Sequence, residues 1–215
     1  MSAVRIGVCD YGVGNLRSVE RAIEAAGATA VVSADATALE RCDGIVLPGV
    51  GAFGPASLRL RESGMADLVT RYAEQRRPVL GVCLGHQLLF GDSDEGEGGR
   101  GLGLVPGRVM RITPSGLKVP HMGWNTLRCT LPSPLLDGVH DGAFMYFVHS
   151  YAAADAEPRD VVATTEYGGT IVAVVHRGSV MGTQFHPEKS GRAGLRIYAN
   201  FAALCARDAA PAGAR

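Results

Sequence analysis

The sequence has no excess of charge of either sign. Its 21 Lys and Arg residues balance 21 Asp and Glu residues, so the formal net charge at pH 7 is zero. Proteins that grip nucleic acid or an anionic membrane electrostatically carry a surplus of basic side chains. Partners of these two kinds are therefore not expected.

Long apolar runs and paired cysteines are also missing. No stretch approaches the roughly 20 apolar residues of a membrane-spanning helix, and the first residues lack the pattern of a secretory signal. The five cysteines are odd in number and widely separated, and no pair has metal-ligand spacing. We therefore expect a cytoplasmic protein with reduced thiols, no metal and no cofactor. Four of the thiols are expected to be buried and inert, and Cys83 is set apart by its neighbours.

The first half of the chain has the pattern of an α/β protein. Apolar, strand-like segments at 4–9, 28–33, 44–47 and 78–82 alternate with helical patterns over 16–26 and near 64–76. Continuous apolar strands between helices are typical of a mostly parallel sheet that is covered on both faces.

The second half has a different texture. Short strands separated by turns are predicted near 102–112, 124–131, 144–148, 161–166, 171–176 and 179–184, followed by a helix over 191–206. We expect these strands to extend the same sheet, which would then be mixed and mostly parallel. One domain over 1–206 and a frayed tail over 207–215 are the predicted organisation.

Cys83 lies in a sequence typical of a nucleophile. The segment 81–85 reads GVCLG, follows an apolar strand and precedes a helical pattern. A strand–turn–helix around G-x-C-x-G is the context of a nucleophile elbow. The flanking glycines would allow a sharp turn and leave room for substrate beside the sulfur, and the Leu84 N–H could stabilise an oxyanion. The alternative is an ordinary buried cysteine at the end of a core strand.

A base for this cysteine is available in the segment QFHPE at 184–188. His186 could accept the thiol proton and return it to the leaving amine, and Glu188 could hold the imidazole in one tautomer. Pro187 favours an extended His186, and residues i and i+2 of an extended segment project to the same side. Such triplets also occur in surface turns, so the assignment is a hypothesis at this point.

The remaining histidines give little support to other chemistry. His140 and His176 lie in polar, turn-like surroundings and are expected to be solvated. No two histidines have the i, i+4 spacing of a helical zinc site, and no cysteine–histidine cluster occurs. Metal-dependent hydrolysis is therefore disfavoured.

Together, GVCLGHQ at 81–87 and QFHPE at 184–188 resemble the two signature motifs of class I glutamine amidotransferases. Four further segments are similar to the glutaminase family of imidazole glycerol phosphate synthase: DYGVGNLRSV at 10–19, LPGVGAFG at 47–54, KVPHMGWN at 118–125 and YFVHSY at 146–151. The similarity runs from about residue 4 to 205 and implies a flavodoxin-like fold. At position 86 this chain has histidine, where the family more often has methionine.

The resemblance implies roles for individual residues. Cys83, His186 and Glu188 would form a triad that cleaves the side-chain amide of glutamine through a γ-glutamyl thioester. A peptide N–H near Val50 or Gly51 would rotate to complete the oxyanion hole with Leu84. The residues expected to bind glutamine are Gly51, Leu84, Gln87, Glu95, Ser150 and Tyr151. For Glu95, a solvated acidic loop over 92–97 is the alternative.

The resemblance also implies a partner. A (β/α)8-barrel cyclase would form a heterodimer with this chain, receive the ammonia and make imidazole glycerol phosphate and AICAR in histidine biosynthesis. In such complexes, nucleotide binding to the cyclase activates the glutaminase, so allosteric coupling is expected. The residues expected at the interface or along the ammonia passage are Asn15, Trp124, Tyr146 and Lys189. For Trp124, core packing is the alternative.

Three other functions stay open on the sequence alone. The first is the same chemistry with another acceptor, such as that of anthranilate synthase. The second is a cysteine hydrolase or thiol-dependent chaperone-like protein on a similar fold, which would need neither Glu188 nor the glycine-rich strip at 48–51. The third is a binding module that has lost catalysis.

Overall fold

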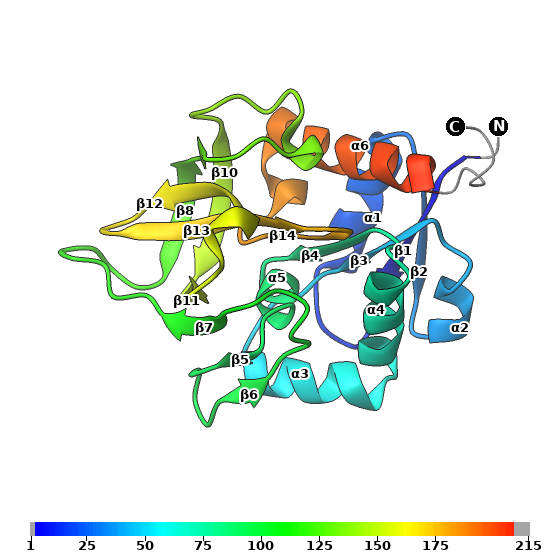
Figure 1. Cartoon of the computed structure of the whole chain (residues 1–215), viewed down its shortest axis with the longest axis horizontal. Helices are drawn as coiled ribbons and strands as arrows, with labels where there is room; N and C mark the ends of the chain where they lie inside the picture. Colours follow the sequence, from blue (N-terminus) through cyan, green and yellow to red (C-terminus); the bar gives the residue numbers. More distant parts are fainter. Residues whose placement is uncertain (1–2, 209–215) are drawn as a thin grey trace.

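A central sheet of eight strands, in the order β2-β1-β3-β4-β14-β13-β12-β9, organises the computed structural model, which describes residues 3–208 (Figure 1). The strands from β2 to β14 pair in parallel, and those from β14 to β9 pair antiparallel. Their bounds are β1 Arg5–Cys9, β2 Thr29–Ser33, β3 Gly44–Leu47, β4 Val79–Val82, β9 Arg128–Cys129, β12 Val161–Glu166, β13 Thr170–Arg177 and β14 Val180–Thr183. The prediction of a mixed, mostly parallel sheet is confirmed.

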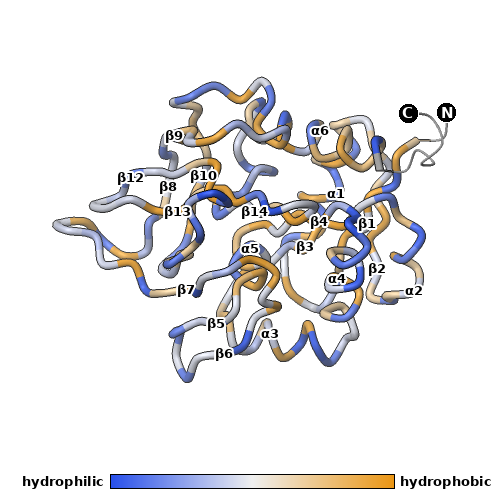
Figure 2. The backbone as a smooth tube through the Cα atoms, in the orientation of Figure 1, coloured by the Kyte–Doolittle hydropathy of each residue, from blue (hydrophilic) through white to orange (hydrophobic). Residues whose placement is uncertain are grey.

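Helices cover both faces of this sheet. On one face lie α1 Leu16–Ala25 and α6 Gly191–Asp208, and on the other lie α2 Ala36–Leu39, α3 Phe53–Glu62, α4 Met65–Glu74 and α5 Leu84–Leu88. Side chains alternate along each strand, so Val46 of β3 joins the first core while Ile45 and Leu47 join the second. Both sides of β3 and β4 are buried, which is why these two strands contain only apolar residues and glycine (Figure 2).

Two further small sheets lie outside the central one. β8 His121–Thr126 pairs with β10 Phe144–His149, while β5 Asp92–Ser93, β6 Gly99–Arg100, β7 Arg108–Arg111 and β11 Tyr151–Ala154 form a four-stranded sheet. The expectation that all later strands extend one sheet is therefore wrong. In β10 only alternate residues are fully buried. One face of this strand is buried in the protein and the other is not, whereas the central strands are covered on both faces.

Helix α3 was not predicted. Its first residues are Phe53, Gly54 and Pro55, and the glycine and proline obscure the helical pattern. Proline is tolerated here because the N–H groups of the first turn have no helical acceptor. The buried positions Phe53, Ala56 and Leu60 nevertheless follow helical spacing.

The remaining helical elements are short 3-10 turns at Pro134–Leu136, Pro158–Asp160 and Pro187–Lys189. Helix α6 continues to Asp208, slightly beyond the predicted end at 206. Residues 209–215 of the predicted frayed tail lie outside the described residues. The boundary between domain and tail at residue 206 stays a prediction.

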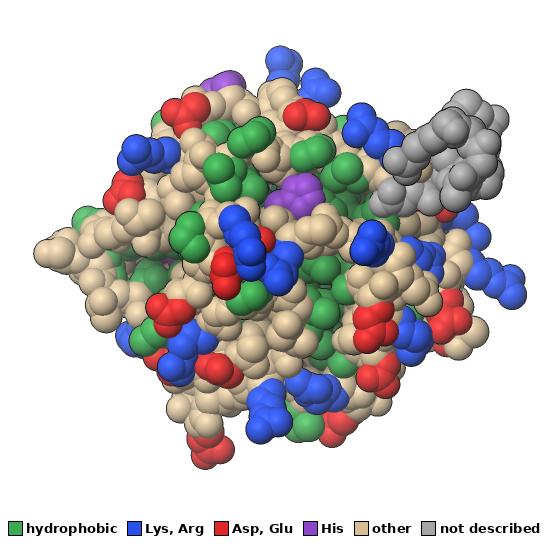
Figure 3. Space-filling model, in the orientation of Figure 1, with side chains coloured by type: hydrophobic (Ala, Val, Ile, Leu, Met, Phe, Trp, Pro, Cys, Tyr) green, Lys and Arg blue, Asp and Glu red, His purple; other side chains and the backbone are tan. Residues whose placement is uncertain are grey.

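None of the described helices has the length and apolarity needed to cross a bilayer. On the face drawn in Figure 3, acidic and basic side chains are interspersed.

Candidate active site

Cys83 occupies a sharp turn between β4 and α5, at the carboxyl end of a strand in the middle of the sheet. Its backbone is in an unusual conformation, with φ +55° and ψ −110°. A non-glycine residue held in such a region costs on the order of 1–3 kcal/mol, and strain of this kind concentrates at functional sites. The conformation is held by the Cys83 N–H, which donates to the Thr183 oxygen at 2.8 Å, and by the Gln87 N–H, which donates to the Cys83 oxygen at 3.1 Å.

Gly81 and Gly85, which flank Cys83, do not leave room for substrate beside the sulfur as expected. A Cβ atom on Gly81 would lie 2.6 Å from the Gly85 oxygen, and one on Gly85 would overlap the carbonyl oxygen of Leu47. A Cβ atom on Gly49 would lie 2.8 Å from the Gly85 nitrogen. These glycines therefore let the elbow pack directly against the end of β3. The space beside their Cα atoms is filled by protein backbone and is not room for substrate.

His186 follows β14, the neighbour of β4, and is joined to a buried carboxylate. Its Nδ1 lies 2.7 Å from Glu188 Oε1, and the two side chains are 3% and 2% exposed. His186 itself is extended, with φ −97° and ψ 97°. Glu188, however, belongs to the 3-10 turn Pro187–Lys189, so it reaches the imidazole through a turn and not along an extended segment as expected.

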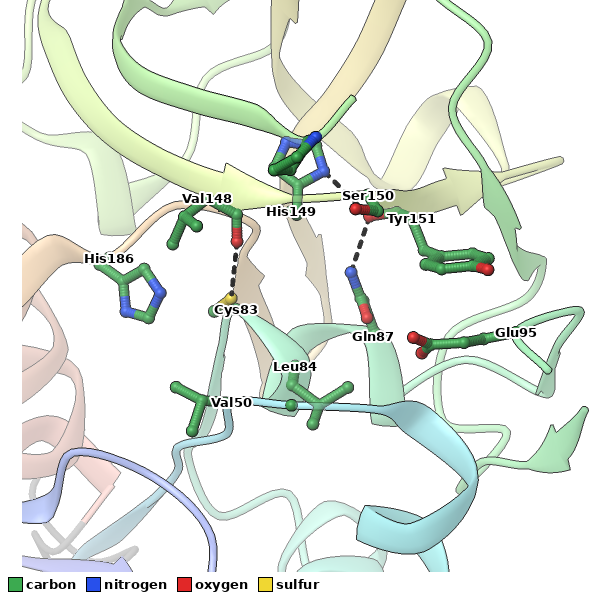
Figure 4. Close-up of a pocket in the computed structure, with 12 residues that line it drawn as sticks. Val50, Cys83, Leu84, Gln87, Glu95, Val148, His149, Ser150, Tyr151 and His186 are labelled. Carbon is green, nitrogen blue, oxygen red and sulfur yellow. Dashed lines mark hydrogen bonds between the residues drawn. The ribbon is translucent and has the colours of Figure 1, made fainter. Parts of the chain in front are cut away.

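The charge state of His186 depends on these neighbours. Burial alone would lower its pKa, but Cys83 and Glu188 beside it outweigh burial and raise the pKa to about 9. Its Nε2 is buried and has no hydrogen-bond partner among the described residues. Figure 4 shows the His186 ring beside Cys83, whose Sγ lies 4.0 Å from the Val148 oxygen. A ring nitrogen is thus left free to exchange a proton with the sulfur.

A cavity of about 300 Å³ opens over Cys83 (Figure 4). All six residues predicted to bind glutamine line it, as do Val50 and His186. Three other lining residues, Pro120, Val148 and His149, were not predicted, although they lie within the segments 118–125 and 146–151.

The Gln87 amide is fixed on the cavity wall. Its Nε2 donates to the Tyr151 carbonyl oxygen at 2.8 Å and to Gln184 Oε1 at 3.0 Å. A carbonyl oxygen only accepts, so the nitrogen must face Tyr151. Both N–H groups of the amide are therefore committed, and its Oε1 is the atom left for a ligand.

Glu95 differs from the other carboxylates of its segment. It lines the cavity, and its Oε2 accepts the Phe53 N–H at the start of α3 at 2.8 Å. Asp92 pairs with Arg108 at 3.3 Å on the surface, and Asp94 accepts the Arg111 N–H at 3.1 Å. The alternative of a solvated acidic loop therefore does not describe Glu95.

The glycine-rich strip after β3 borders the cavity. Val50 is 43% exposed, and Gly51 has φ +93°, which favours glycine. The preceding Pro48 is held from beneath, because the buried Tyr11 hydroxyl donates to its carbonyl oxygen at 2.7 Å. Leu84, the first residue of α5, presents an N–H of the kind that has no helical acceptor.

Three of the four predicted interface residues lie together. Trp124 of β8 and Tyr146 of β10 are paired, with ring centroids 6.0 Å apart, and Lys189 Nζ lies 5.8 Å from the Tyr146 ring. Trp124 is 56% exposed, so the alternative of core packing is wrong. Asn15 is exposed at the start of α1, which contacts the turn that carries Lys189.

Two smaller expectations are corrected. His176 is not solvated, because it is half-buried in β13, its Nδ1 is 2.7 Å from Ser133 Oγ, and burial lowers its pKa. Cys129 is half-buried, whereas Cys9, Cys42 and Cys205 are buried as expected. The exposure of His140 is confirmed.

Comparison with known proteins places this chain and its fold in a class. Residues 7–204 match the family model described as glutamine amidotransferase class-I. A solved structure titled "Crystal structure of glutamine amidotransferase" has the same fold, with a TM-score of 0.74 at 20% identity over 94% of this chain and 98% of that chain. The chain is a class-I glutamine amidotransferase.

Curated relatives narrow the class further. The imidazole glycerol phosphate synthase subunit HisH of a Synechococcus species is 49% identical over 217 residues, which cover 100% of both chains. The subunit of the same name from Halobacterium salinarum is 52% identical over 207 residues, or 93% of each chain. The chain belongs to this HisH family. The anthranilate synthase alternative is therefore not favoured.

Proposed function

We propose that this chain hydrolyses L-glutamine with Cys83 as nucleophile, His186 as proton carrier and Glu188 as its orienting group, and that it delivers ammonia to a cyclase subunit of imidazole glycerol phosphate synthase. One observation carries the proposal. A cysteine on a strained elbow faces an imidazole whose far nitrogen is bound to a buried carboxylate, 2.7 Å away. This is the arrangement that activates a nucleophile by an adjacent, oriented base.

Acylation begins with transfer of the Cys83 thiol proton to His186 Nε2. The thiolate attacks the side-chain carbonyl carbon of glutamine, and a tetrahedral oxyanion forms. The imidazolium then protonates the amide nitrogen, the C–N bond breaks, and ammonia leaves a γ-glutamyl thioester on Cys83. Glu188 holds the proton on Nδ1, so Nε2 is the nitrogen that carries each proton.

Deacylation uses the same groups in the opposite order. A water gives a proton to His186 Nε2 and attacks the thioester carbonyl, the C–S bond breaks, and the proton returns to the sulfur. Glutamate is released and Cys83 is restored. The raised pKa of His186, about 9, favours the protonated imidazole that the first proton transfer produces.

The oxyanion would be stabilised by the Leu84 N–H and by a peptide N–H of the strip at Val50 and Gly51. Both residues line the cavity with Cys83. A conformation that glycine tolerates at Gly51 makes rotation of this peptide sterically inexpensive. Removing one donor from an oxyanion hole costs about 10²- to 10³-fold in kcat.

Substrate recognition follows from the polar groups that converge on the cavity. Glu95 supplies a carboxylate for the α-ammonium group of glutamine, and Gln87 Oε1 accepts a hydrogen bond from the bound glutamine. Gly51, Leu84 and the backbone of Ser150 and Tyr151 complete the lining. A cavity of about 300 Å³ is at the small end of ligand pockets, as an amino acid requires.

The partner is a (β/α)8-barrel cyclase in a cytoplasmic heterodimer. Large apolar side chains are exposed on the outer face of β8 and β10, among them Met122 at 61%, Trp124 at 56% and Phe144 at 61%. Exposed apolar patches with polar rims are typical of protein interfaces. Tyr146 and Lys189 extend this face, and Asn15 lies at the start of the helix that contacts the Lys189 turn.

The test is glutamate release by the purified chain, alone and with the cyclase subunit and its nucleotide ligand. We expect release that the cyclase and ligand accelerate, and none from Cys83→Ala. Cys129→Ala is the matched control, because this thiol is partly buried and does not line the cavity. Release that survives Cys83→Ala, or that is absent under every condition, contradicts the proposal.

A further inference from the structure

Behind the wall of the cavity lies a chain of polar side chains that the mechanism does not use. His149 lines the cavity at the end of β10 and lies directly opposite His121 of β8. His121 Nδ1 is 2.9 Å from His149 Nε2, and His121 Nε2 is 3.2 Å from Asn125 Nδ2. His149 Nδ1 is 2.9 Å from the carbonyl oxygen of Tyr151.

The inner end of this chain fixes one tautomer. The Tyr151 oxygen can only accept, so His149 Nδ1 must carry a proton. In a neutral ring the other nitrogen, Nε2, is then an acceptor. It follows that His121 Nδ1 is the donor of the bond between the two rings.

The outer end requires the same arrangement independently. Asn125 Oδ1 accepts the Thr126 N–H at 2.8 Å, and Asn125 Nδ2 donates to the Glu166 oxygen at 2.9 Å. The orientation of the amide is thereby fixed, and its second N–H faces His121 Nε2. His121 Nε2 therefore accepts, which again leaves the proton on Nδ1.

Both rings must be neutral for all these bonds to form. A second proton on His121 would face the Asn125 N–H, and one on His149 would face the N–H of His121. Burial lowers the pKa of both rings to about 4, which keeps them neutral at pH 7. His121 is also stacked between the rings of Phe147 and Tyr167, with centroids 4.7 and 4.0 Å away.

This series of hydrogen-bonded side chains ends at the Tyr151 carbonyl, which also contacts the substrate site. The Tyr151 oxygen that accepts from His149 also accepts from Gln87 at 2.8 Å. Two donors thus share one carbonyl, and its position sets where the Gln87 amide is held. A displaced Tyr151 carbonyl would release one of the two bonds that orient Gln87 Oε1 toward the cavity.

We propose that His121 and His149 are positioning residues for glutamine binding, which act through the Tyr151 carbonyl on Gln87. This inference rests on the proposed glutaminase function and adds to it a role for two histidines that perform no proton transfer. His121 does not line the cavity, and its hydrogen bond to His149 connects it to the substrate site.

The kinetic test compares variants in the complex with the cyclase. His121→Phe retains an aromatic ring for the stack but removes both hydrogen bonds. We expect it to raise the KM for glutamine about tenfold and to change kcat less than about threefold, because loss of one hydrogen bond to a bound group acts on binding. His149→Phe should do the same, and His149→Asn should recover most of the loss, since its amide nitrogen can still donate to Tyr151.

His140→Phe is the matched control, because this histidine is exposed and its ring bonds the carbonyl oxygen of the neighbouring Asp141. An unchanged KM in His121→Phe overturns the inference even if His149→Phe is impaired, because His149 lines the cavity and could act directly. A loss in kcat of His121→Phe that equals its loss in kcat/KM also overturns the inference.

A spectroscopic test is independent of activity. In the ¹⁵N-labelled wild-type chain at pH 7, imidazole nitrogen shifts should report both His121 and His149 as neutral rings protonated on Nδ1. A ring protonated on Nε2, or a charged ring, overturns the inference. A wild type that shows these tautomers and does not release glutamate would refute the proposed function alone.

Discussion

His86 allows the physical account to be tested by a single substitution. The residue follows the elbow in α5 and is fully buried, with its ring 5.2 Å from that of Phe90. Neither of its ring nitrogens has a hydrogen-bond partner among the described residues. Burial, with a smaller contribution from the nearby His149, lowers its pKa from 6.5 to about 3. The perturbation is His86→Met, which keeps a side chain of similar volume and removes both nitrogens.

The expected effect has two parts. At pH 7 the variant should be more stable by on the order of 1–3 kcal/mol, because a buried polar group without a partner costs about that much. As pH falls below 6.5, unfolded wild-type chains take up a proton that the native ring refuses until about pH 3. Native stability is therefore lost as pH falls through this window, at about 1.4 kcal/mol per pH unit. The variant lacks this loss.

The assay is urea unfolding of both chains at pH 7, 6, 5 and 4. Because the other titrating groups are common to both chains, the difference in unfolding free energy isolates His86. It should widen by roughly 3 kcal/mol between pH 6.5 and 4. Leu88→Met in the same helix is the control, since it changes a buried apolar side chain without removing a titrating group. Parallel curves for wild type and His86→Met would contradict this expectation, because His86 would then be solvated or paired.

Three other substitutions follow from the site. Glu188→Gln should lower kcat on the order of 10²- to 10⁴-fold, which is less than the loss from Cys83→Ala, because Glu188 orients His186 and does not react. An equal loss of kcat in the two variants argues against these roles. Glu95→Gln should raise the KM for glutamine about tenfold or more, a charge-assisted bond being lost, whereas Glu97→Gln, outside the cavity, should not. Gly85→Ala should destabilise the fold by more than about 3 kcal/mol in urea unfolding, since its methyl overlaps the Leu47 oxygen. Gly91→Ala, whose methyl would meet the Gly107 oxygen at 3.4 Å, should be tolerated.

The central strands were predictable because burial on both faces leaves a local trace. Residues 44–47 and 78–82 are continuous apolar runs, and the structure places β3 and β4 there within a residue. Helix α3 left a weaker trace, since Gly54 and Pro55 occupy its first turn and interrupt the pattern. Its buried positions lie at helical spacing, but the glycine-rich strip before it directs attention to a turn.

The separate pairing of β8 with β10 could not be derived locally. His121 and His149 are 28 residues apart and meet only through the register of that pair. The alternation of buried and exposed residues in β10 leaves no trace in its sequence, because residues 144–148 are all apolar or aromatic. The hydrogen-bonded series of side chains from Asn125 to Gln87 could not be predicted for the same reason, because it depends on the positions of backbone carbonyl groups.

The elbow and the His186–Glu188 pair were predicted more fully, because their residues are close in sequence and their types are chemically specific. The reason given for Glu188 was nevertheless wrong, since a 3-10 turn and not an extended segment brings it to the imidazole. The predicted glutamine-binding residues line the cavity together, and their individual roles stay predictions until binding is measured.

Capture of the acyl-enzyme would show whether Cys83 attacks glutamine. The chain, in complex with the cyclase and its nucleotide, is mixed with glutamine, quenched in acid within a turnover and mapped by peptide mass spectrometry. We expect the mass of one γ-glutamyl group on the peptide that contains Cys83, removable by hydroxylamine as a thioester is. Glutamate release without any such adduct on Cys83, or an adduct on another residue, would contradict the proposed attack by Cys83.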